Sequence, residues 1–210
     1  VMECGAHSVT IHLREDRRHI KDLDVIKICK NKKIITNLEI SLNENIINIA
    51  LKNKPNFICI VPEKRKEVTT EGGLNLLKNL NKIKKTIQRF KEKKIRTSLF
   101  INPNIKDIKI AKELKTDCIE LHTGKISDLV KRKKSYSNEF KKIKRCSELA
   151  NKIGLEVHAG HGLDYKTTKI LSNLREIKEF NIGHFIIGES LVYGLKSIIK
   201  KFKKISSKKQ

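Results

Sequence analysis

Histidine and glutamate side chains stand at the ends of several short β-branched runs in this sequence. The polar residues at these ends are, in chain order, His12, Arg14, Glu39, Glu63, Asn102, Glu120, His122, His158, His161 and His184. Imidazole titrates near neutral pH, and a positioned carboxylate can accept or release a proton. The pattern predicts general acid–base catalysis. For any single histidine, the alternative is a hydrogen-bonded residue of the protein core.

Glycines flank the late histidines, in Gly160-His161-Gly162, Gly183-His184 and Gly188-Glu189-Ser190. Loops of this kind bind phosphate through backbone N–H groups and a helix N-terminus. An earlier segment, 67–73, offers two threonine hydroxyls and a Gly-Gly pair. Both regions predict phosphate contacts, and the latter also predicts a lid loop. Turn glycines and a helix N-cap are the alternatives.

A charged run from Arg14 to His19 follows the first β-branched run. Arginine suits bidentate recognition of phosphate or carboxylate, whereas a run of charges is more often a solvated surface. We expect Arg14 and His19 to bind ligand and about half of the run to be surface.

Strand-like apolar segments alternate with amphipathic helical segments along the chain. The expected strands cover 8–13, 34–41, 56–62, 97–102, 118–123, 155–159 and 182–187, and the clearest expected helices cover 74–93 and 138–153. Such alternation predicts an α/β fold with a parallel sheet covered by helices. Seven units are one short of a TIM (β/α)8 barrel. The opening segment resembles the tail of a helix ended by Gly5. We therefore expect a barrel whose first β strand is missing from this chain. An open doubly wound sheet is the alternative, but no GxGxxG follows any strand.

Length and composition fit one domain. The chain has 210 residues, 38% of them hydrophobic, and we expect a single barrel domain over 1–205 and a Lys-rich disordered tail over 206–210. No apolar run reaches 18 residues and no secretory signal is visible, so we expect no membrane contact. The five cysteines form no CxxC pair. Buried free thiols and a cytoplasmic location are the expectation.

A formal net charge of +24 invites a nucleic-acid-binding interpretation. The last fifteen residues hold seven lysines, but the excess runs along the whole chain. It consists mostly of lysine, aromatic residues make up only 5% and tryptophan is absent. Specific nucleic-acid surfaces tend to use arginine interleaved with aromatic residues. The pattern therefore favours a compositional bias, and we expect no nucleic-acid partner.

Seven segments resemble motifs of the pyridoxine 5′-phosphate synthase family, in the same order along nearly the whole chain. They are Thr10-Ile11-His12-Leu13-Arg14-Glu15-Asp16-Arg17-Arg18-His19-Ile20, Asn37-Leu38-Glu39, Val61-Pro62-Glu63-Lys64-Arg65 with 67–73, Ser98-Leu99-Phe100-Ile101, Ile119-Glu120-Leu121-His122-Thr123-Gly124, Ala159-Gly160-His161-Gly162-Leu163, and Asn181-Ile182-Gly183-His184-Phe185-Ile186-Ile187-Gly188.

The resemblance implies a cofactor-free and metal-free barrel that assembles as a homo-octamer. Its reaction condenses 3-amino-2-oxopropyl phosphate with 1-deoxy-D-xylulose 5-phosphate, releasing phosphate and water. By resemblance, His12 and Glu39 accept protons, His161 donates one, and Glu120 stabilises a transition state. The residues implied to hold the deoxyxylulose phosphate are Arg14, His19 and Thr69. Those implied to hold the amino-ketone phosphate are Gly162, Gly183 and His184.

The sequence departs from the family at its start, because the family's opening strand carries an Asn, an Asp-His pair and an Arg that contact substrate. Without that segment we expect an incomplete barrel that does not bind both substrates. A second functional hypothesis is a metal-dependent barrel epimerase or hydrolase using His158, His161 and either Glu120 or His122, although this spacing is not a strong ligand pattern.

Overall fold

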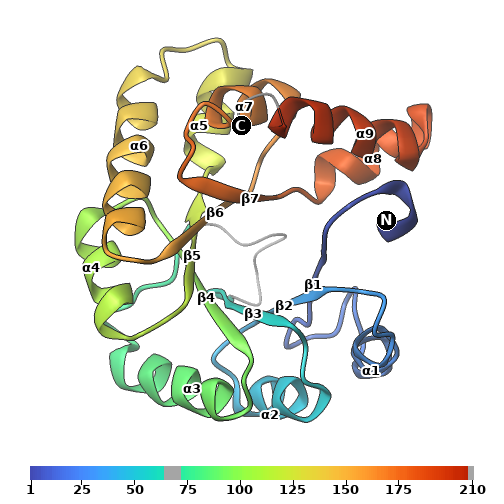
Figure 1. Cartoon of the computed structure of the whole chain (residues 1–210), viewed down its shortest axis with the longest axis vertical. Coiled ribbons are helices and arrows are strands. Elements are labelled where there is room, and N and C mark those ends of the chain that lie inside the picture. The colour runs from blue at the N-terminus through green and yellow to red at the C-terminus, as the bar shows by residue number, and fades with distance from the viewer. Residues whose placement is uncertain (64–71, 208–210) are drawn as a thin grey trace.

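Seven parallel strands form one curled sheet in which each strand pairs with its neighbours in the sequence (Figure 1). The computed structural model describes residues 1–63 and 72–207. The strands are β1 (Val9–His12), β2 (Thr36–Ile40), β3 (Phe57–Ile60), β4 (Arg96–Ile101), β5 (Cys118–His122), β6 (Glu156–Gly160) and β7 (Ile177–Asn181). Their sequential order places all the carboxyl ends at one rim of the curl, as in TIM-like barrels.

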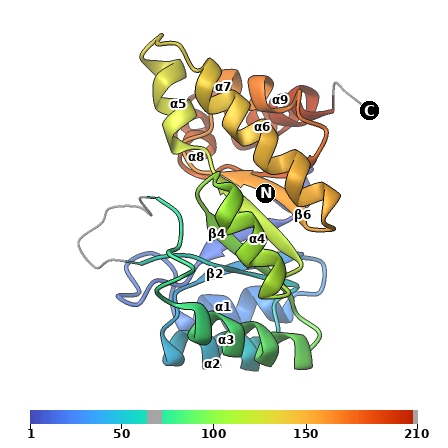
Figure 2. The same cartoon turned by 90° about the vertical axis from the view of Figure 1, so that its left-hand side faces the viewer.

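Helices cover the outside of the sheet in both views (Figures 1 and 2). They are η1 (Met2–Cys4), α1 (Asp22–Lys30), α2 (Glu44–Asn53), α3 (Leu80–Glu92), α4 (Ile105–Glu113), α5 (Gly124–Lys131), α6 (Ser137–Lys152), α7 (Tyr165–Leu171), α8 (His184–Tyr193) and α9 (Leu195–Ser206). Short polar side chains begin α2, α4 and α7, where Asn43, Asn104 and Asp164 accept backbone N–H groups.

Two chemically different layers result from the alternation of side chains along each strand. One face carries Leu38, Ile40, Ile58, Ile60 and Leu99, which are buried in the main core with the helices. The other face lines the inside of the curl. Its apolar part is a small separate cluster, and its polar residues include Thr10, Asn37, Ser98, Glu120 and His158. The inside of the sheet is therefore where buried polar chemistry is possible.

The expected parallel α/β architecture is confirmed. The expected helix end at Gly5 is also confirmed, because η1 ends there with Gly5 at a φ of 99°. Within the described ranges, β1 and β7 each pair on one side only, so the sheet is a curled half-barrel. The helix expected from residue 74 begins at Leu80, after a turn.

The seventh strand was predicted wrongly. We expected it at 182–187, but β7 is Ile177–Asn181, and most of the expected range belongs to α8. A short apolar run has no periodicity that separates a strand from a helix. Phe185 packs edge-on against Tyr165 and Phe202, so its apolar side chain serves helix packing. The true strand, β7, carries the charged residues Lys178 and Glu179, so it lacks the continuous apolar run that predicts a buried parallel strand.

Four of the five free cysteines are buried, as expected. No helix in the described part of the chain is long and apolar enough to cross a membrane. Helix α9 continues to Ser206, and residues 208–210 of the expected tail lie outside the described residues.

Candidate active site

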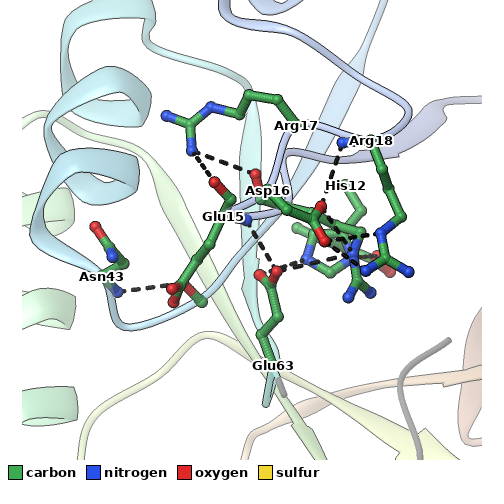
Figure 3. Close-up of polar contacts among 10 residues, drawn as sticks. His12, Glu15, Asp16, Arg17, Arg18, Asn43 and Glu63 are labelled. Carbon is green, nitrogen blue, oxygen red and sulfur yellow. Dashed lines mark hydrogen bonds and ion pairs between the residues drawn. The ribbon is translucent and has the colours of Figure 1, made fainter. Parts of the chain in front are cut away.

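His12 lies between two carboxyl groups at the rim formed by the strand ends (Figure 3). Its Nδ1 is 3.6 Å from Oε2 of Glu39, and its Nε2 is 3.6 Å from Oε2 of Glu63. The first contact follows from register, because His12 pairs with Glu39 across β1 and β2. Glu63 arrives from the segment just after β3.

The pKa values of His12 and Glu39 move in opposite directions. Burial, with a smaller contribution from Arg14, lowers the pKa of His12 from 6.5 to about 4. Burial raises the pKa of Glu39 from 4.5 to about 7. Both groups are therefore biased toward their uncharged forms. A neutral imidazole beside a carboxyl group that titrates near neutral pH is suited to proton transfer.

Glu120 lies deeper inside the sheet, with only 2% of its surface exposed. Its Oε2 accepts a hydrogen bond from Nδ2 of Asn181 at 2.8 Å and a weak one from the Cys59 thiol at 3.9 Å. Burial, then the nearby Glu39, raises the pKa of Glu120 well above 4.5. Gly160 makes room for this carboxyl, since a Cβ there would stand 1.9 Å from Oε1 of Glu120.

Asn181 joins the last strand to the first two. Its Oδ1 accepts a hydrogen bond from Oγ1 of Thr10 at 2.8 Å, and that hydroxyl accepts one from Nδ2 of Asn37 at 3.3 Å. Asn181 and Cys59 are site residues that were not expected from the sequence. Asn181 opens the last of the seven motifs and ends β7, but the strand expected at 182–187 placed it before a strand and not at a strand end.

His161 and His122 form a ring pair whose centroids are 4.9 Å apart. Burial and the neighbouring His161 lower the pKa of His122 to about 4. His161 has a φ of 78°, an uncommon conformation for a residue with a side chain. The Thr123 hydroxyl fixes this loop by donating to the carbonyls of Gly160 and His161, both at 2.7 Å. Gly124 leaves space for both rings, since a Cβ there would clash with each.

The charged loop after β1 separates into one buried cation and several outer ones. The side chain of Arg14 is only 5% exposed, and its Nε lies 3.5 Å from Asp16 and 3.8 Å from Glu63. Arg17 and Arg18 pair with Asp22 and Asp16 nearer the surface. His19 is exposed, yet close enough for its charge to lower the pKa of His12.

Three expected phosphate-binding residues lie in the exposed loops after β6 and β7. Gly162 has a φ of 74°, Gly183 is the N-cap of α8, and His184 is the first residue of that helix. The helix N-terminus offers backbone N–H groups to an anion. Thr69, the remaining expected phosphate contact, lies outside the described residues.

The three residues of the metal hypothesis do not form a ligand cluster in the part of the chain that the structure describes. Among the described residues, the group of three that could hold a metal is Cys118, Glu156 and His158, without His161 or Glu120. Nη2 of Arg96 lies 3.2 Å from the Cys118 sulfur and 3.1 Å from Glu156. This guanidinium supplies the positive charge that a cation would otherwise bring.

A family model described as "Pyridoxal phosphate biosynthesis protein PdxJ" matches residues 1–208. The chain belongs to the PdxJ family. A pyridoxine 5′-phosphate synthase from Pelagibacter ubique is 75% identical over 208 residues, covering 99% of this chain and 87% of the relative. Another from a Wolbachia endosymbiont of Drosophila simulans is 43% identical, covering 96% of this chain and 85% of the relative.

The PdxJ chain also resembles more distant barrel structures. A 3-keto-L-gulonate-6-phosphate decarboxylase from Vibrio cholerae superposes with a TM-score of 0.65 at 12% identity, covering 93% of this chain and 86% of the other. At that identity the likeness concerns the fold alone. It agrees with a curled parallel sheet of the TIM-barrel kind.

Proposed function

We propose that this PdxJ chain condenses 3-amino-2-oxopropyl phosphate with 1-deoxy-D-xylulose 5-phosphate into pyridoxine 5′-phosphate, phosphate and water. The synthase activity accords with the family and with the names of the relatives, and it is a step of vitamin B6 biosynthesis. The observation that carries the proposal is the contact between His12 and Glu39. The pKa of His12 is lowered to about 4, and the pKa of Glu39 is raised to about 7.

The condensation is a series of proton transfers, because imine formation, dehydration and aromatisation each move protons at carbon, nitrogen or oxygen. His12 and Glu39 are the proposed proton acceptors, since one is a neutral imidazole and the other titrates near pH 7. His161 is the proposed proton donor, held toward the rim by its constrained loop. Fixed geometry around both substrates supplies the remaining rate enhancement.

Glu120 is proposed to stabilise a transition state. Because burial and Glu39 favour its protonated form, Glu120 can donate a hydrogen bond to oxygen or nitrogen on which negative charge develops. The amide of Asn181 and the space over Gly160 fix the carboxyl in place. This arrangement keeps a buried acid ready without a change of conformation.

Two groups of residues are proposed to hold the two phosphates. Arg14, His19 and Thr69 would bind the phosphate of deoxyxylulose phosphate, and buried Arg14 supplies a fixed charge for it. Gly162, Gly183 and His184 would bind the amino-ketone phosphate. The N-terminus of α8 and the imidazole of His184 support that assignment.

We further propose that an eighth strand, the first of the family's barrel, closes the gap between β1 and β7. Two features support it. The side chains of Thr10 and Asn181 already bridge the gap, and α8 next to it exposes Ile187, Leu191 and Val192 by 60%, 85% and 74%. The closed domain would span 1–205 together with that strand. We also propose that the protein assembles as a homo-octamer. We propose the cytoplasm as its location, because a reducing compartment suits free thiols.

The test is to incubate both substrates with the purified chain, and with a version carrying the first β/α unit of the Pelagibacter ubique relative. Pyridoxine 5′-phosphate is measured by chromatography and mass spectrometry, and inorganic phosphate is measured in parallel. We expect equal amounts of the two products from the version with the added unit. No product from either protein overturns the proposed function.

A further inference from the structure

Glu63 contacts three groups, one at the end of β1 and two in the loop after it, with the two oxygens of one carboxyl (Figure 3). Its Oε1 accepts the backbone N–H of Glu15 at 2.9 Å and lies 3.8 Å from Nε of Arg14. Its Oε2 lies 3.6 Å from Nε2 of His12. The side chain is only 2% exposed, so it is largely shielded from water.

Two polar atoms that face each other here lack hydrogen-bond partners among the described residues. They are Nε2 of His12 and Oε2 of Glu63, and both are buried. Buried polar atoms in proteins are almost always hydrogen-bonded, so a facing pair of this kind requires an explanation. Hydrogen bonds between catalytic groups are often long before substrate binds and shorten in the complex. A proton on Nε2, shared with Glu63, satisfies both atoms at once.

We propose that Glu63 is a positioning residue that holds His12 in the Nε2–H tautomer and leaves Nδ1 as the basic nitrogen facing Glu39. The proposal deepens the proposed function and rests on it for the role of His12. It assigns Glu63 the part that an orienting carboxylate plays beside a catalytic histidine.

The two carboxyl groups beside His12 differ in a way that decides which one holds the N–H. Burial, with smaller contributions from the carboxylates of Glu15 and Asp16, raises the pKa of Glu63, and the Glu15 amide and the Arg14 guanidinium partly oppose that rise. Burial alone raises the pKa of Glu39 to about 7. The Glu63 carboxyl is fixed by the Glu15 N–H and lies beside the Arg14 guanidinium, which suits it to be the permanent acceptor, while Glu39 faces Nδ1 and can exchange a proton with it.

The same carboxyl also links the base to the phosphate site. Arg14, the proposed anchor of deoxyxylulose phosphate, and His12 share Glu63 as their neighbour. Glu63 thus fixes the distance between the phosphate anchor and the basic nitrogen. This gives a specific role to Glu63, which the strand pattern predicts only as one of several polar residues at strand ends.

Histidine-ring ¹⁵N–¹H spectra test the proposal on the chain carrying the added β/α unit, with the His12 signals assigned by their loss in H12N. The charged and titratable groups facing His12 are Glu39 of β2, Glu63 after β3, and Arg14, Asp16 and His19 of its own loop. We expect unmodified His12 to be the Nε2–H tautomer. E63Q, which keeps shape but removes the charge, should lower the pKa of His12 by about one unit.

The matched control is E15Q. Glu15 lies on the same loop, but its side chain accepts a hydrogen bond from Ser41 and not from His12. E15Q should leave the His12 titration near that of the unmodified protein. An Nδ1–H tautomer, or an E63Q titration that coincides with that of E15Q, overturns the proposal. If E63Q does not fold, the tautomer of His12 in the unmodified protein decides whether the proposal holds.

Turnover gives a second readout in the condensation assay. E63Q should lower kcat about 10²-fold and move the pH profile of kcat to lower pH, a shift that a purely structural role does not produce. An unmoved profile counts against the proposal. Failure of the proposed function can be told apart from failure of this proposal. If the proposed function is wrong, neither the unmodified protein nor E63Q makes product, but the His12 ring spectra still show which nitrogen carries the proton.

Discussion

At the scale of single residues, burial shifts the pKa values of two neighbouring groups in opposite directions. His12 and Glu39 come from neighbouring strands in matched register, yet one loses and the other gains proton affinity. Burial penalises the charged form, which is the cation for imidazole and the anion for carboxyl. The proposed acid–base pair therefore follows from one physical cause acting on two residue types.

Glu39→Gln should lower kcat by about 10²–10⁴-fold, the usual contribution of a positioned acid or base. The amide keeps the shape of the side chain and removes the titratable group, so the fold should be preserved. Steady-state kinetics on the chain carrying the added β/α unit measure the loss of kcat, and circular dichroism is the control for folding. A near-normal rate shows that Glu39 is not a proton acceptor.

The same substitution should change how stability depends on pH. Glu39 has a pKa of about 7 in the folded chain against an ordinary value of 4.5. Its contribution is thus fully present below pH 4.5 and is lost as the pH rises through 7. Glu39→Gln removes this loss, so the variant should gain at most about 3 kcal/mol relative to the unmodified chain over that interval. Denaturant unfolding at several pH values measures the difference, and parallel curves contradict it.

His161→Asn should block a protonation step and leave substrate capture intact. The proposed phosphate contacts nearby are the glycines Gly162 and Gly183, so a change of the His161 side chain would leave them in place. Single-turnover experiments should show substrates bound and an intermediate accumulating. Collapsed affinity with an unchanged rate for bound substrate would make His161 a binding residue instead.

At the scale of elements, six of the seven strands lie where the apolar runs predicted them. Buried parallel strands form short runs rich in apolar residues, so β2 to β6 are visible in the sequence even though their inner faces carry polar side chains. The last strand escaped because Lys178 and Glu179 interrupt it, while the following helix supplies the apolar run. Most candidate site residues could be found as strand ends. Asn181 and the role of Glu63 could not, because each acts through partners far away in the sequence.

Asn181 should couple energetically to Thr10 across the open side of the sheet. Their side chains share a 2.8 Å hydrogen bond between β7 and β1. In a double-mutant cycle of Asn181→Leu and Thr10→Val, the coupling should be about 0.5–3 kcal/mol, the range for contacting residues. Equilibrium unfolding measures it, and Thr10→Val with Ser172→Ala serves as the control pair, since the Ser172 hydroxyl donates to the Lys169 carbonyl at its own helix end. Strict additivity for Asn181 and Thr10 contradicts the link.

At the scale of the whole molecule, the open side of the half-barrel should limit stability. Unpaired edges of β1 and β7 invite association, and α8 exposes apolar side chains beside them. The 210-residue chain made alone should therefore be inactive, aggregate readily and melt at a low temperature.

Adding one β/α unit of about 30 residues should restore solubility, a cooperative transition and product formation. Melting curves and the condensation assay on both forms decide the matter. A chain that is soluble, cooperative and fully active without the addition shows that seven strands suffice.

The sequential strand order has a consequence for how the protein is made on the ribosome. Each strand pairs with the one synthesised just before it, so the sheet can grow in the direction of translation. Glu120, however, receives the Asn181 hydrogen bond only after nearly the whole chain has emerged. The nascent chain thus builds its scaffold early and completes the buried acid last. A chain that ends before β7 would have the first six strands of the sheet but would lack the Asn181 hydrogen bond to Glu120, a proposed catalytic residue.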